Sequence, residues 1–480
     1  MKILFVTSEA YPLLKTGGLA DVAGALPAAL AALGEDVRIL LPAYPDAVAA
    51  AKDKQDAISL GDPLGVGEVR LIKARMPVTG TELWLIDCPA LYDRAGNPYT
   101  QKDGTDWPDN PLRFAMLSRV AAMLSVPGNA TGWTADIVHA NDWQGGLTAA
   151  YLHFWGGRHA RSVFTVHNLQ YQGLFKREIL PQAGLPEAAF SVDGLEFHDK
   201  VSFLKSGLYY SDAITTVSPT YAKEIMGDAL GCGLDGLLRL RSDVLSGVLN
   251  GVDDETWNPA TDKHLDHRYS LARRTGKAKN KTALQAELGL PSGTKAPLLG
   301  MVTRLTAQKG IDLVVNALPA LRKSGFQLAV LGTGDTKWER ALSDLAATDP
   351  NISVRIGYDE AMAHRIIAAS DVFLMPSRFE PCGLTQMYAL RYGTLPLVRK
   401  TGGLADTVVD VRQGDSGTGF VFEPADGAAL SAAAARAAAL FKNVKAWRKV
   451  QRTAMQQDFS WAHAAQAYQK LYRDLAAKTA

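Results

Sequence analysis

The heptapeptide Lys-Thr-Gly-Gly-Leu-Ala-Asp occurs twice, at residues 15–21 and 400–406, and each copy follows a strand-like apolar run. Paired glycines let a backbone approach a ligand because no Cβ intervenes. The N–H groups at the start of the following helix favour an anion, and the lysine adds a positive charge. We therefore expect two halves of the chain, each presenting a cationic glycine loop to a shared cleft. The alternative is a duplicated helix-capping loop without a ligand.

Two further cations, Arg304 and Lys309, lie between a strand-like run at 297–303 and a helix-like run that begins at Gly310. Basic side chains are slightly unfavourable at the positive end of a helix, which argues for an anion between them. Their placement suits a diphosphate. The alternative is a pair of solvated surface charges.

Residues 376–385 join another apolar strand to a helix. Glu380 is placed where a carboxylate could meet a ligand, and the N–H groups of Gly383, Leu384 and Thr385 could hold phosphate. The alternative for Glu380 is a charge that complements the helix dipole. Cys382 is interpreted as a space-filling residue, since no histidine nearby in sequence would activate it.

Polar side chains also follow two strands of the first half. His167 and Asn168 follow the run at 163–166, and Asp142 follows the run at 136–140. Strand-end side chains of parallel sheets tend to face the ligand. The alternatives are a structural histidine and a helix cap. Tyr358, after the run at 352–356, could stack on a flat base or pack against the protein.

Other ligand signals are weak or missing. Gly332-Thr333-Gly334 is a partial dinucleotide fingerprint, with Lys337 where its third glycine would stand. The sequence has no Asp-x-Asp pair and no His/Cys set at metal-binding spacing. We therefore expect Arg and Lys, with no metal or other cofactor, to neutralise the phosphate charge.

The elements that position these residues alternate between strand and helix in both halves. Expected strands lie at 36–41, 82–87, 136–140, 162–166 and 212–217, then at 297–303, 327–331, 352–356, 371–375, 395–398 and 419–422. Such alternation predicts an α/β fold of two doubly wound, Rossmann-like domains, each with a parallel sheet covered on both faces. We place the domains at 1–245 and 246–456, with a final helix within 457–480.

The composition limits the classes of protein to which the chain can belong. The 480 residues are 47% hydrophobic and 21% charged, as in ordinary globular enzymes, and suffice for two domains. A net charge of +2 predicts no general attraction to nucleic acid or a membrane surface. Three cysteines form no disulfide framework, and no apolar run approaches the ~20 residues of a membrane span. We expect a cytoplasmic protein.

Together these motifs resemble bacterial glycogen synthases and plant starch synthases, which are retaining glucosyltransferases of the GT-B fold. The resemblance spans nearly the whole chain, and its most specific pieces are residues 15–21, 165–169, 249–253, Arg304 with Lys309, and 380–386. It implies transfer of glucose from ADP-glucose to the non-reducing end of an α-1,4-glucan such as glycogen. It also implies a last helix that crosses back onto the first domain.

The resemblance implies a role for each matching residue. In the first half, Lys15, Gly17, Gly18 and Asp21 would meet the donor, and His167, Asp142 and Asn250 would face the sugar. In the second half, Arg304 and Lys309 would hold the diphosphate, and Tyr358 would stack on adenine. Glu380 and the Cys382–Thr385 backbone (Cys382, Gly383, Leu384, Thr385) would bind donor hydroxyls and phosphate.

The chain departs from its relatives at three positions: Ala20 replaces a glycine of some members, Gln144 replaces a common histidine, and Tyr388 stands where related transferases carry a second glutamate. Three alternative functions stay open on the residues alone. They are a UDP-glucose-dependent transferase of the same fold, a non-catalytic glucan-binding protein and an NAD-dependent oxidoreductase.

Overall fold

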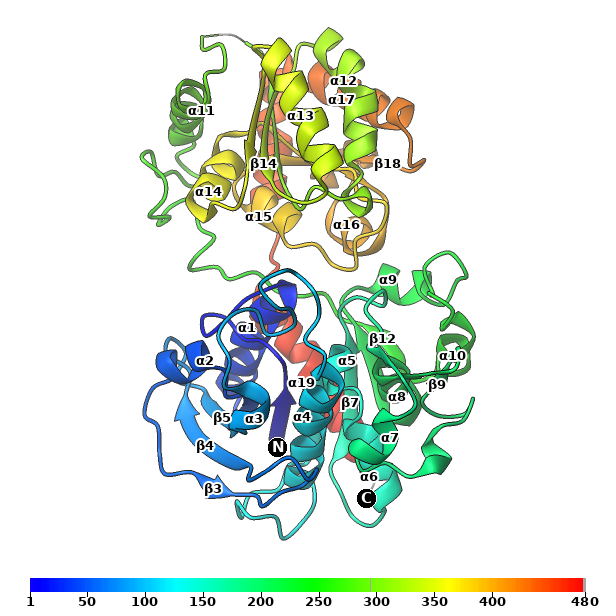
Figure 1. The fold of residues 1–480 in the computed structure, drawn as a ribbon. Coiled ribbons are helices and arrows are strands. Elements are labelled where there is room, and N and C mark those ends of the chain that lie inside the picture. The colour runs from blue at the N-terminus through cyan, green and yellow to red at the C-terminus, as the bar shows by residue number, and fades with distance from the viewer. Residues whose placement is uncertain (294, 478–480) are drawn as a thin grey trace. The chain divides into compact units, whose positions relative to one another are not determined.

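The computed structural model describes residues 1–293 and 295–477, which fold as two compact units. The first unit contains residues 1–251 together with the segment that begins at Trp461, and the second is Val252–Ser460 (Figure 1). Each unit is a largely parallel sheet with helices packed on it, as the sequence predicted.

The first unit is built on a nine-stranded sheet with the order β12-β11-β7-β6-β1-β2-β5-β4-β3. Its central strand β1 is buried from Ile3 to Val6 because both faces are covered, which explains the unbroken apolar run. The strands of this sheet are β1 (Lys2–Val6), β2 (Asp36–Pro42), β3 (Ile58–Ser59), β4 (Arg70–Arg75), β5 (Glu82–Asp87), β6 (Ile137–Asn141), β7 (Arg161–Val166), β11 (Ala213–Thr216) and β12 (Leu245–Gly247).

One edge of this sheet differs from the all-parallel expectation. Strand β4 pairs antiparallel with β5, and β3 pairs antiparallel with β4. Only the short segment 76–81 joins β4 to β5, and a parallel pairing would need a crossover of a dozen residues or more. A separate small antiparallel sheet contains β8 (Leu174–Phe175), β10 (Lys200–Ser202) and β9 (Glu196–Phe197).

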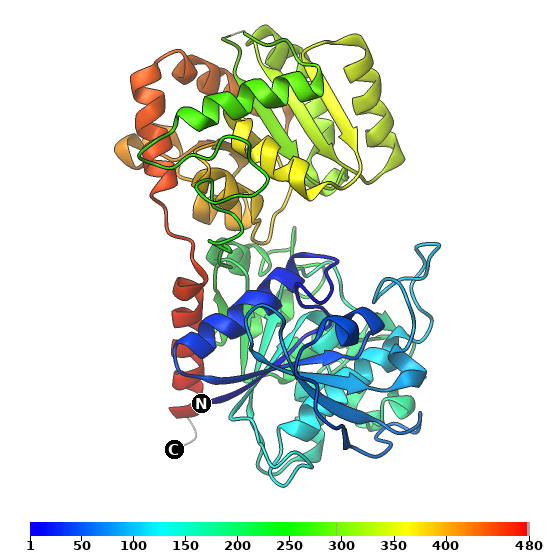
Figure 2. The same cartoon turned by 90° about the vertical axis from the view of Figure 1, so that its left-hand side faces the viewer.

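Helices cover both faces of the large sheet (Figure 2). The C-terminal helix α19 lies alongside α1, so the end of the chain returns to the first unit as predicted. The helices of this unit are α1 (Gly18–Ala32), α2 (Pro45–Ala50), α3 (Pro89–Tyr92), α4 (Asn110–Leu124), α5 (Asp142–Gly145), α6 (Thr148–Trp155), α7 (Ile179–Gln182), α8 (Phe203–Tyr210), α9 (Pro219–Glu224), α10 (Asp235–Leu240) and α19 (Trp461–Ala477), with a 3-10 turn at Glu187–Ala189.

The second unit is a six-stranded, fully parallel sheet with the order β15-β14-β13-β16-β17-β18. Its strands are β13 (Leu298–Val302), β14 (Gln327–Gly332), β15 (Ile352–Ile356), β16 (Val372–Met375), β17 (Leu395–Arg399) and β18 (Phe420–Phe422). Its helices are α11 (Thr275–Leu288), α12 (Ile311–Lys323), α13 (Thr336–Thr348), α14 (Glu360–Ala369), α15 (Thr385–Arg391), α16 (Gly402–Thr407), α17 (Gly427–Phe441) and α18 (Val444–Met455), with 3-10 turns at Ala307–Lys309 and Val411–Ser416.

The parallel strands of each unit bring the segments that follow them to one edge of its sheet. In the first unit those segments follow β1, β6 and β7, and in the second they follow β13, β15 and β16. This edge is where open parallel sheets bind ligands. Within residues 1–293 and 295–477, no helix has both the length and the apolar character needed to cross a membrane.

Candidate active site

The first glycine loop is held by a carboxylate that the sequence motifs do not indicate. Glu9 follows β1, and its Oε2 accepts hydrogen bonds from Thr16 N at 2.5 Å, Thr16 Oγ1 at 2.6 Å and Gly17 N at 3.2 Å. Burial raises the pKa of Glu9, and the bonds from Thr16 and Gly17 oppose that shift. The position of Glu9, just past the carboxyl end of β1, was the signal that could have revealed it.

The loop leaves Lys15 and Gly18 at the surface. Lys15 Nζ donates to Asp21 Oδ1 at 2.7 Å, which holds the ammonium over the first turn of α1. A Cβ added to Gly18 would meet no atom within 4 Å. Packing among the described residues therefore gives no reason for a glycine at position 18, whereas the close approach of a ligand would give one.

His167 and Asp142 come together at the ends of β7 and β6. Asp142 Oδ1 accepts a hydrogen bond from His167 N at 2.7 Å. Asn141 donates from Nδ2 to Val6 O at 3.0 Å, so its Oδ1 accepts from His167 Nε2 at 2.9 Å. This arrangement places the ring proton of His167 on Nε2 and leaves a lone pair on Nδ1.

Burial sets the protonation of this pair. It raises the pKa of the Asp142 carboxyl to about 7, although the backbone N–H groups of His167 and Asn168 favour the ionised form. It lowers the pKa of His167 to about 3, so the imidazole is neutral at pH 7. The pair thus combines a neutral imidazole with a carboxyl group that titrates near neutrality, a combination suited to polar contact with a sugar.

In the second unit, Lys309 and Glu380 form a close ion pair. Lys309 Nζ lies 2.5 Å from Glu380 Oε2, and the same oxygen accepts from Ser377 Oγ at 3.0 Å. Lys309 ends the 3-10 turn after β13, and Glu380 lies in the loop after β16. Arg304, also after β13, is exposed. Arg304, Lys309 and Glu380 thus all follow strands at this edge of the sheet.

The segment after Glu380 turns sharply into α15. Gly383 has φ +69°, and a Cβ there would collide with the Gln386 side chain. Gln386 Nε2 in turn donates to Cys382 O and Gly383 O, both at 3.0 Å, which fixes the turn. Cys382 is buried, in keeping with a space-filling role, and Leu384 immediately precedes Thr385, the first residue of α15. The turn thus leads to N–H groups at a helix start, where an anion is favoured.

The second copy of the glycine loop is used differently from the first. Gly402 and Gly403 are buried, and Gly403 N donates to the carbonyls of Glu380 and Pro381 at 3.1 Å. Lys400 Nζ pairs with Glu423 Oε1 at 2.9 Å on the surface. The expectation that both glycine pairs face a ligand is therefore wrong for this copy. Its glycines are needed because a Cβ at either would collide with the backbone of Glu380 or Cys382.

The remaining predicted residues occupy distinct surroundings. Tyr358 is 79% exposed just beyond β15, so its ring is accessible. Asn250 is buried in the last residues of the first unit, next to Gly251, which packs closely on Trp461. Tyr388, the position of the second glutamate in related transferases, is buried and stacks on Trp257 with ring centroids 3.9 Å apart.

Comparison with known families matches both units. Residues 2–240 match the family model described as starch synthase catalytic domain, and residues 286–452 match the one described as glycosyl transferases group 1.

Full-length relatives are similar to this chain throughout. It is 52% identical to the glycogen synthase of Paramagnetospirillum magneticum over 482 aligned residues, which cover 99% of this chain and 98% of that protein. It is 53% identical to the glycogen synthase of Rhodospirillum rubrum, with 98% of each chain covered.

Solved structures show the same architecture. The catalytic domain of starch synthase IV from Arabidopsis thaliana, solved with ADP and acarbose bound, matches with a TM-score of 0.87, 33% identity and 99% of both chains covered. Sucrose-phosphate synthase from Thermosynechococcus elongatus matches with a TM-score of 0.58 at 20% identity. A similarity at this level of identity shows a shared fold alone. The GT-B prediction is confirmed.

Proposed function

Since the chain belongs to the glycogen synthase family, we propose that it transfers glucose from ADP-glucose to the non-reducing end of an α-1,4-glucan, with retention of configuration. About half of all residues are identical to glycogen synthases over the full length, and this observation carries the reaction class. The ADP and acarbose bound to the Arabidopsis starch synthase support a nucleotide donor and a glucan-like acceptor. We expect the reaction to take place in the cytoplasm.

Donor binding in the second unit would use the carboxyl edge of its sheet. Arg304 and Lys309 supply the positive charge for a diphosphate, and the turn from Cys382 through Gly383 and Leu384 to Thr385 supplies backbone N–H groups. Glu380 would accept hydrogen bonds from glucose hydroxyls while it holds Lys309 in place. The exposed ring of Tyr358 would stack on adenine.

The first unit would supply the sugar and acceptor side. The open position at Gly18 admits close approach of the donor, with Gly17 beside it, and Lys15 would move from Asp21 to the phosphate. His167 and Asp142 would contact the reacting glucose, and Asn250 would contact the sugar. Lys15 belongs to the first unit and Arg304 to the second.

The chemical step breaks the bond between the anomeric carbon and the diphosphate oxygen. Negative charge grows on the departing ADP, and Arg304, Lys309 and helix-end N–H groups would stabilise it; each such contact is worth roughly 3–4 kcal/mol in the transition state. We propose front-side attack, in which the acceptor hydroxyl bonds to the anomeric carbon on the face that ADP leaves. The hydroxyl proton passes to the departing phosphate, which yields ADP and a chain longer by one glucose.

The linkage of the product tests this proposal. Glycogen labelled from radioactive ADP-glucose should release its label as maltose when β-amylase digests the outer α-1,4 chains. Label that stays in the β-amylase-resistant core would contradict transfer to non-reducing ends. A glucosyl adduct trapped on a carboxylate of the enzyme would overturn the front-side mechanism and leave the reaction itself intact.

A further inference from the structure

Three arginines of the second unit come together where α18 passes the start of α11. Arg274 directly precedes α11, and its Nη1 donates to the main-chain oxygen of Arg448 on α18 at 3.0 Å. Arg448 and Arg452 lie four residues apart on α18 and therefore share one face of that helix. We name these three residues the arginine cluster.

The arginine cluster has no acidic partner in the part of the chain that the structure describes. None of its three guanidinium groups forms an ion pair with a described carboxylate. Arg365 and Arg391 of the same unit are partly buried like Arg274, yet each pairs with a carboxylate, at 2.9 and 2.8 Å. Burial lowers the pKa of Arg274, and the charges of Arg452 and Arg448 lower it further. The cluster is thus a concentration of like charge that an anion would relieve.

The sequence around α18 adds to this charge. Residues 442–457 contain five basic side chains and no acidic one. Among the described residues, Lys449 is the one member of the five that forms an ion pair, with Asp415 at 2.5 Å. The whole chain carries a formal net charge of only +2, so the positive charge at α18 is a local feature of the surface.

The cluster belongs to the end of the sheet opposite the donor edge. Lys277, in the first turn of α11, donates to Thr394 Oγ1 at 2.5 Å, and Gln451 of α18 donates from Nε2 to Gly393 O at 2.9 Å. Gly393 and Thr394 directly precede β17, so both helices are anchored at the amino end of that strand. The residues proposed above for the donor diphosphate instead follow the carboxyl ends of strands.

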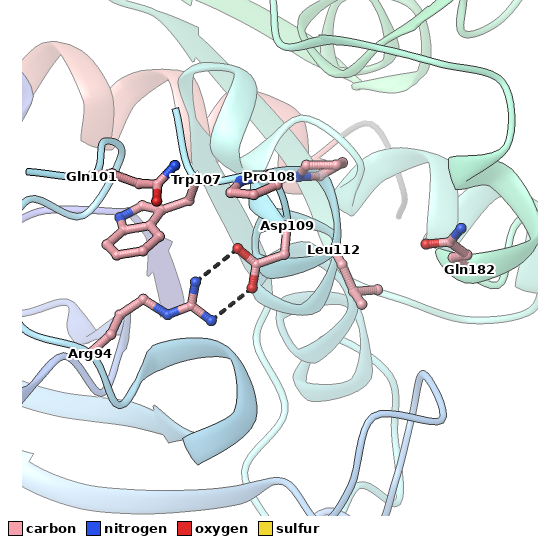
Figure 3. Close-up of a pocket in the computed structure, with 8 residues that line it drawn as sticks. Arg94, Gln101, Trp107, Pro108, Asp109, Leu112 and Gln182 are labelled. Atoms are coloured by element: carbon pink, nitrogen blue, oxygen red, sulfur yellow. Dashed lines mark hydrogen bonds and ion pairs between the residues drawn. The ribbon is translucent and has the colours of Figure 1, made fainter. Parts of the chain in front are cut away.

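A paired arginine elsewhere in the protein shows what sets the cluster apart. A cavity of about 470 Å³ beside the start of α4 contains Arg94, which donates to both carboxylate oxygens of Asp109 at 2.9 and 2.8 Å (Figure 3). An anion could reach that guanidinium only by displacing the carboxylate. An anion that approaches the arginine cluster meets no such competitor among the described residues.

We propose that the arginine cluster binds the phosphate group of a small ligand, at a site separate from the donor site. Guanidinium groups present paired N–H donors that match the oxygens of a phosphate. The three groups come from two elements, α11 and α18, so one phosphate would join them and stabilise the second unit. Because the donor edge lies at the other end of the sheet, the phosphate ligand and the nucleotide can be bound together.

Thermal unfolding with inorganic phosphate tests the site, with ADP present throughout and ionic strength held constant with sodium chloride. We expect the melting temperature to rise by about 3–6 °C at a phosphate concentration ten times the dissociation constant. The double variant Arg448→Gln/Arg452→Gln should lose most of this rise. Without phosphate it should be no less stable than the parent, because the substitutions remove like charges.

Lys442→Gln/Lys445→Gln is the matched control. It removes the same charge from the same exposed segment and leaves the arginine cluster intact, so it should keep the rise with phosphate. An equal loss in both double variants would mean diffuse attraction and would overturn the site. Sodium chloride alone giving the same rise as phosphate would also overturn it.

Tripolyphosphate distinguishes the two sources of the phosphate group. A rise at a lower concentration than for inorganic phosphate, lost in Arg448→Gln/Arg452→Gln, supports the site with a condensed phosphate as its ligand. A rise at the same or a higher concentration supports it with a single phosphate group. The measurement requires no glucose transfer, so the site can fail while the proposed reaction stands, and the reverse.

Discussion

Lys309 Nζ lies 2.5 Å from Glu380 Oε2, so a carboxylate holds the cation that is proposed for the leaving diphosphate. Both side chains are largely buried, with 15% and 8% of their surface exposed. Glu380 is fixed in turn by Ser377 Oγ. The ammonium is thus oriented in advance, and a bound diphosphate would share it with Glu380.

Removal of either partner should lower kcat while the protein remains folded. Lys309→Ala removes a contact that strengthens as charge develops on ADP, so we expect kcat to fall about 10²- to 10³-fold. Glu380→Gln keeps the size of the side chain but loses the ion pair, and we expect a loss of about 10²-fold. Steady-state kinetics with ADP-glucose and glycogen measure both effects. A change confined to the KM for donor would show that the pair serves only ground-state binding.

The two lysines of the repeated heptapeptide should behave differently. Lys15→Ala removes a cation placed over the first turn of α1, and we expect kcat/KM for ADP-glucose to fall at least about tenfold. Lys400→Ala is the matched control because Lys400 pairs with Glu423 on the surface. Its kinetics and melting temperature should stay near those of the parent. Equal losses in both variants would contradict the assignment of the donor site to the first copy.

The glycines of the two loops provide a second matched pair. A Cβ at Gly18 meets no atom within 4 Å, whereas a Cβ at Gly403 collides with the Cys382 backbone. Gly18→Ala should therefore keep its thermal stability and lose activity, and Gly403→Ala should lose stability. Thermal unfolding and activity measured on the same preparations separate the two effects. Full activity in Gly18→Ala would mean that no ligand approaches that position closely.

The raised pKa of Asp142 predicts how stability depends on pH. Its pKa is about 7 in the folded protein, against an ordinary value of 3.8 for an aspartate, so between these values the folded state binds more protons than the unfolded state. The contribution of Asp142 to the free energy of unfolding therefore falls as pH rises from about 4 to 7, by at most about 1.4 kcal/mol per pH unit. Asp142→Asn should remove this trend and be relatively more stable at pH 8 than at pH 5. Urea unfolding at both values measures the difference, and parallel curves would contradict the assigned pKa.

The same titration of Asp142 should raise kcat as pH rises, whereas it lowers the free energy of unfolding. The ionised carboxylate of Asp142 can stabilise positive charge on the anomeric carbon, and the protonated form cannot. We expect kcat to rise with pH to a plateau above about 7, and this limb should be absent in Asp142→Asn. A pH profile of kcat under saturating donor and glycogen shows the limb. If the rising limb persists in Asp142→Asn, a group other than Asp142 is responsible for it.

The C-terminal helix should stabilise the first unit through Tyr472. Its hydroxyl lies 2.7 Å from His139 Nδ1, and His139 Nε2 lies 2.6 Å from Thr165 Oγ1. Tyr472→Phe leaves a buried ring nitrogen without its partner, so we expect a loss of about 1–3 kcal/mol in the free energy of unfolding. Lys470→Ala on the exposed face of the same helix is the control, with an expected change within about 0.5 kcal/mol. Equal stability of both variants would mean that the buried bond contributes nothing.

Much of the fold could be predicted because strands buried on both faces appear as short apolar runs. The expected strands at 82–87 and 352–356 coincide with β5 and β15. The antiparallel strands β3 and β4 were missed because their partly exposed residues interrupt the apolar pattern. Charge and glycine patterns identified, in each of the two large sheets, the edge where polar side chains gather.

Tertiary contacts explain what the sequence could not show about the site. Residues 15–21 and 400–406 are identical, yet one glycine pair is exposed and the other is buried against residues 380–382. Their local sequences carry no information about those neighbours. The role of Glu9 was missed although its position just past β1 marks it as a candidate site residue, because the loop that its carboxylate holds lies seven residues further along the chain.

Glucose transfer to glycogen, measured with ADP-glucose and UDP-glucose side by side and without added metal, is the decisive assay for the proposed reaction. We expect strong transfer from ADP-glucose, little from UDP-glucose, and loss of transfer in Lys309→Ala but not in Lys400→Ala. Efficient transfer from UDP-glucose would overturn the assignment of the base while the two cation sites stand. Absence of transfer from both donors would contradict the proposed reaction.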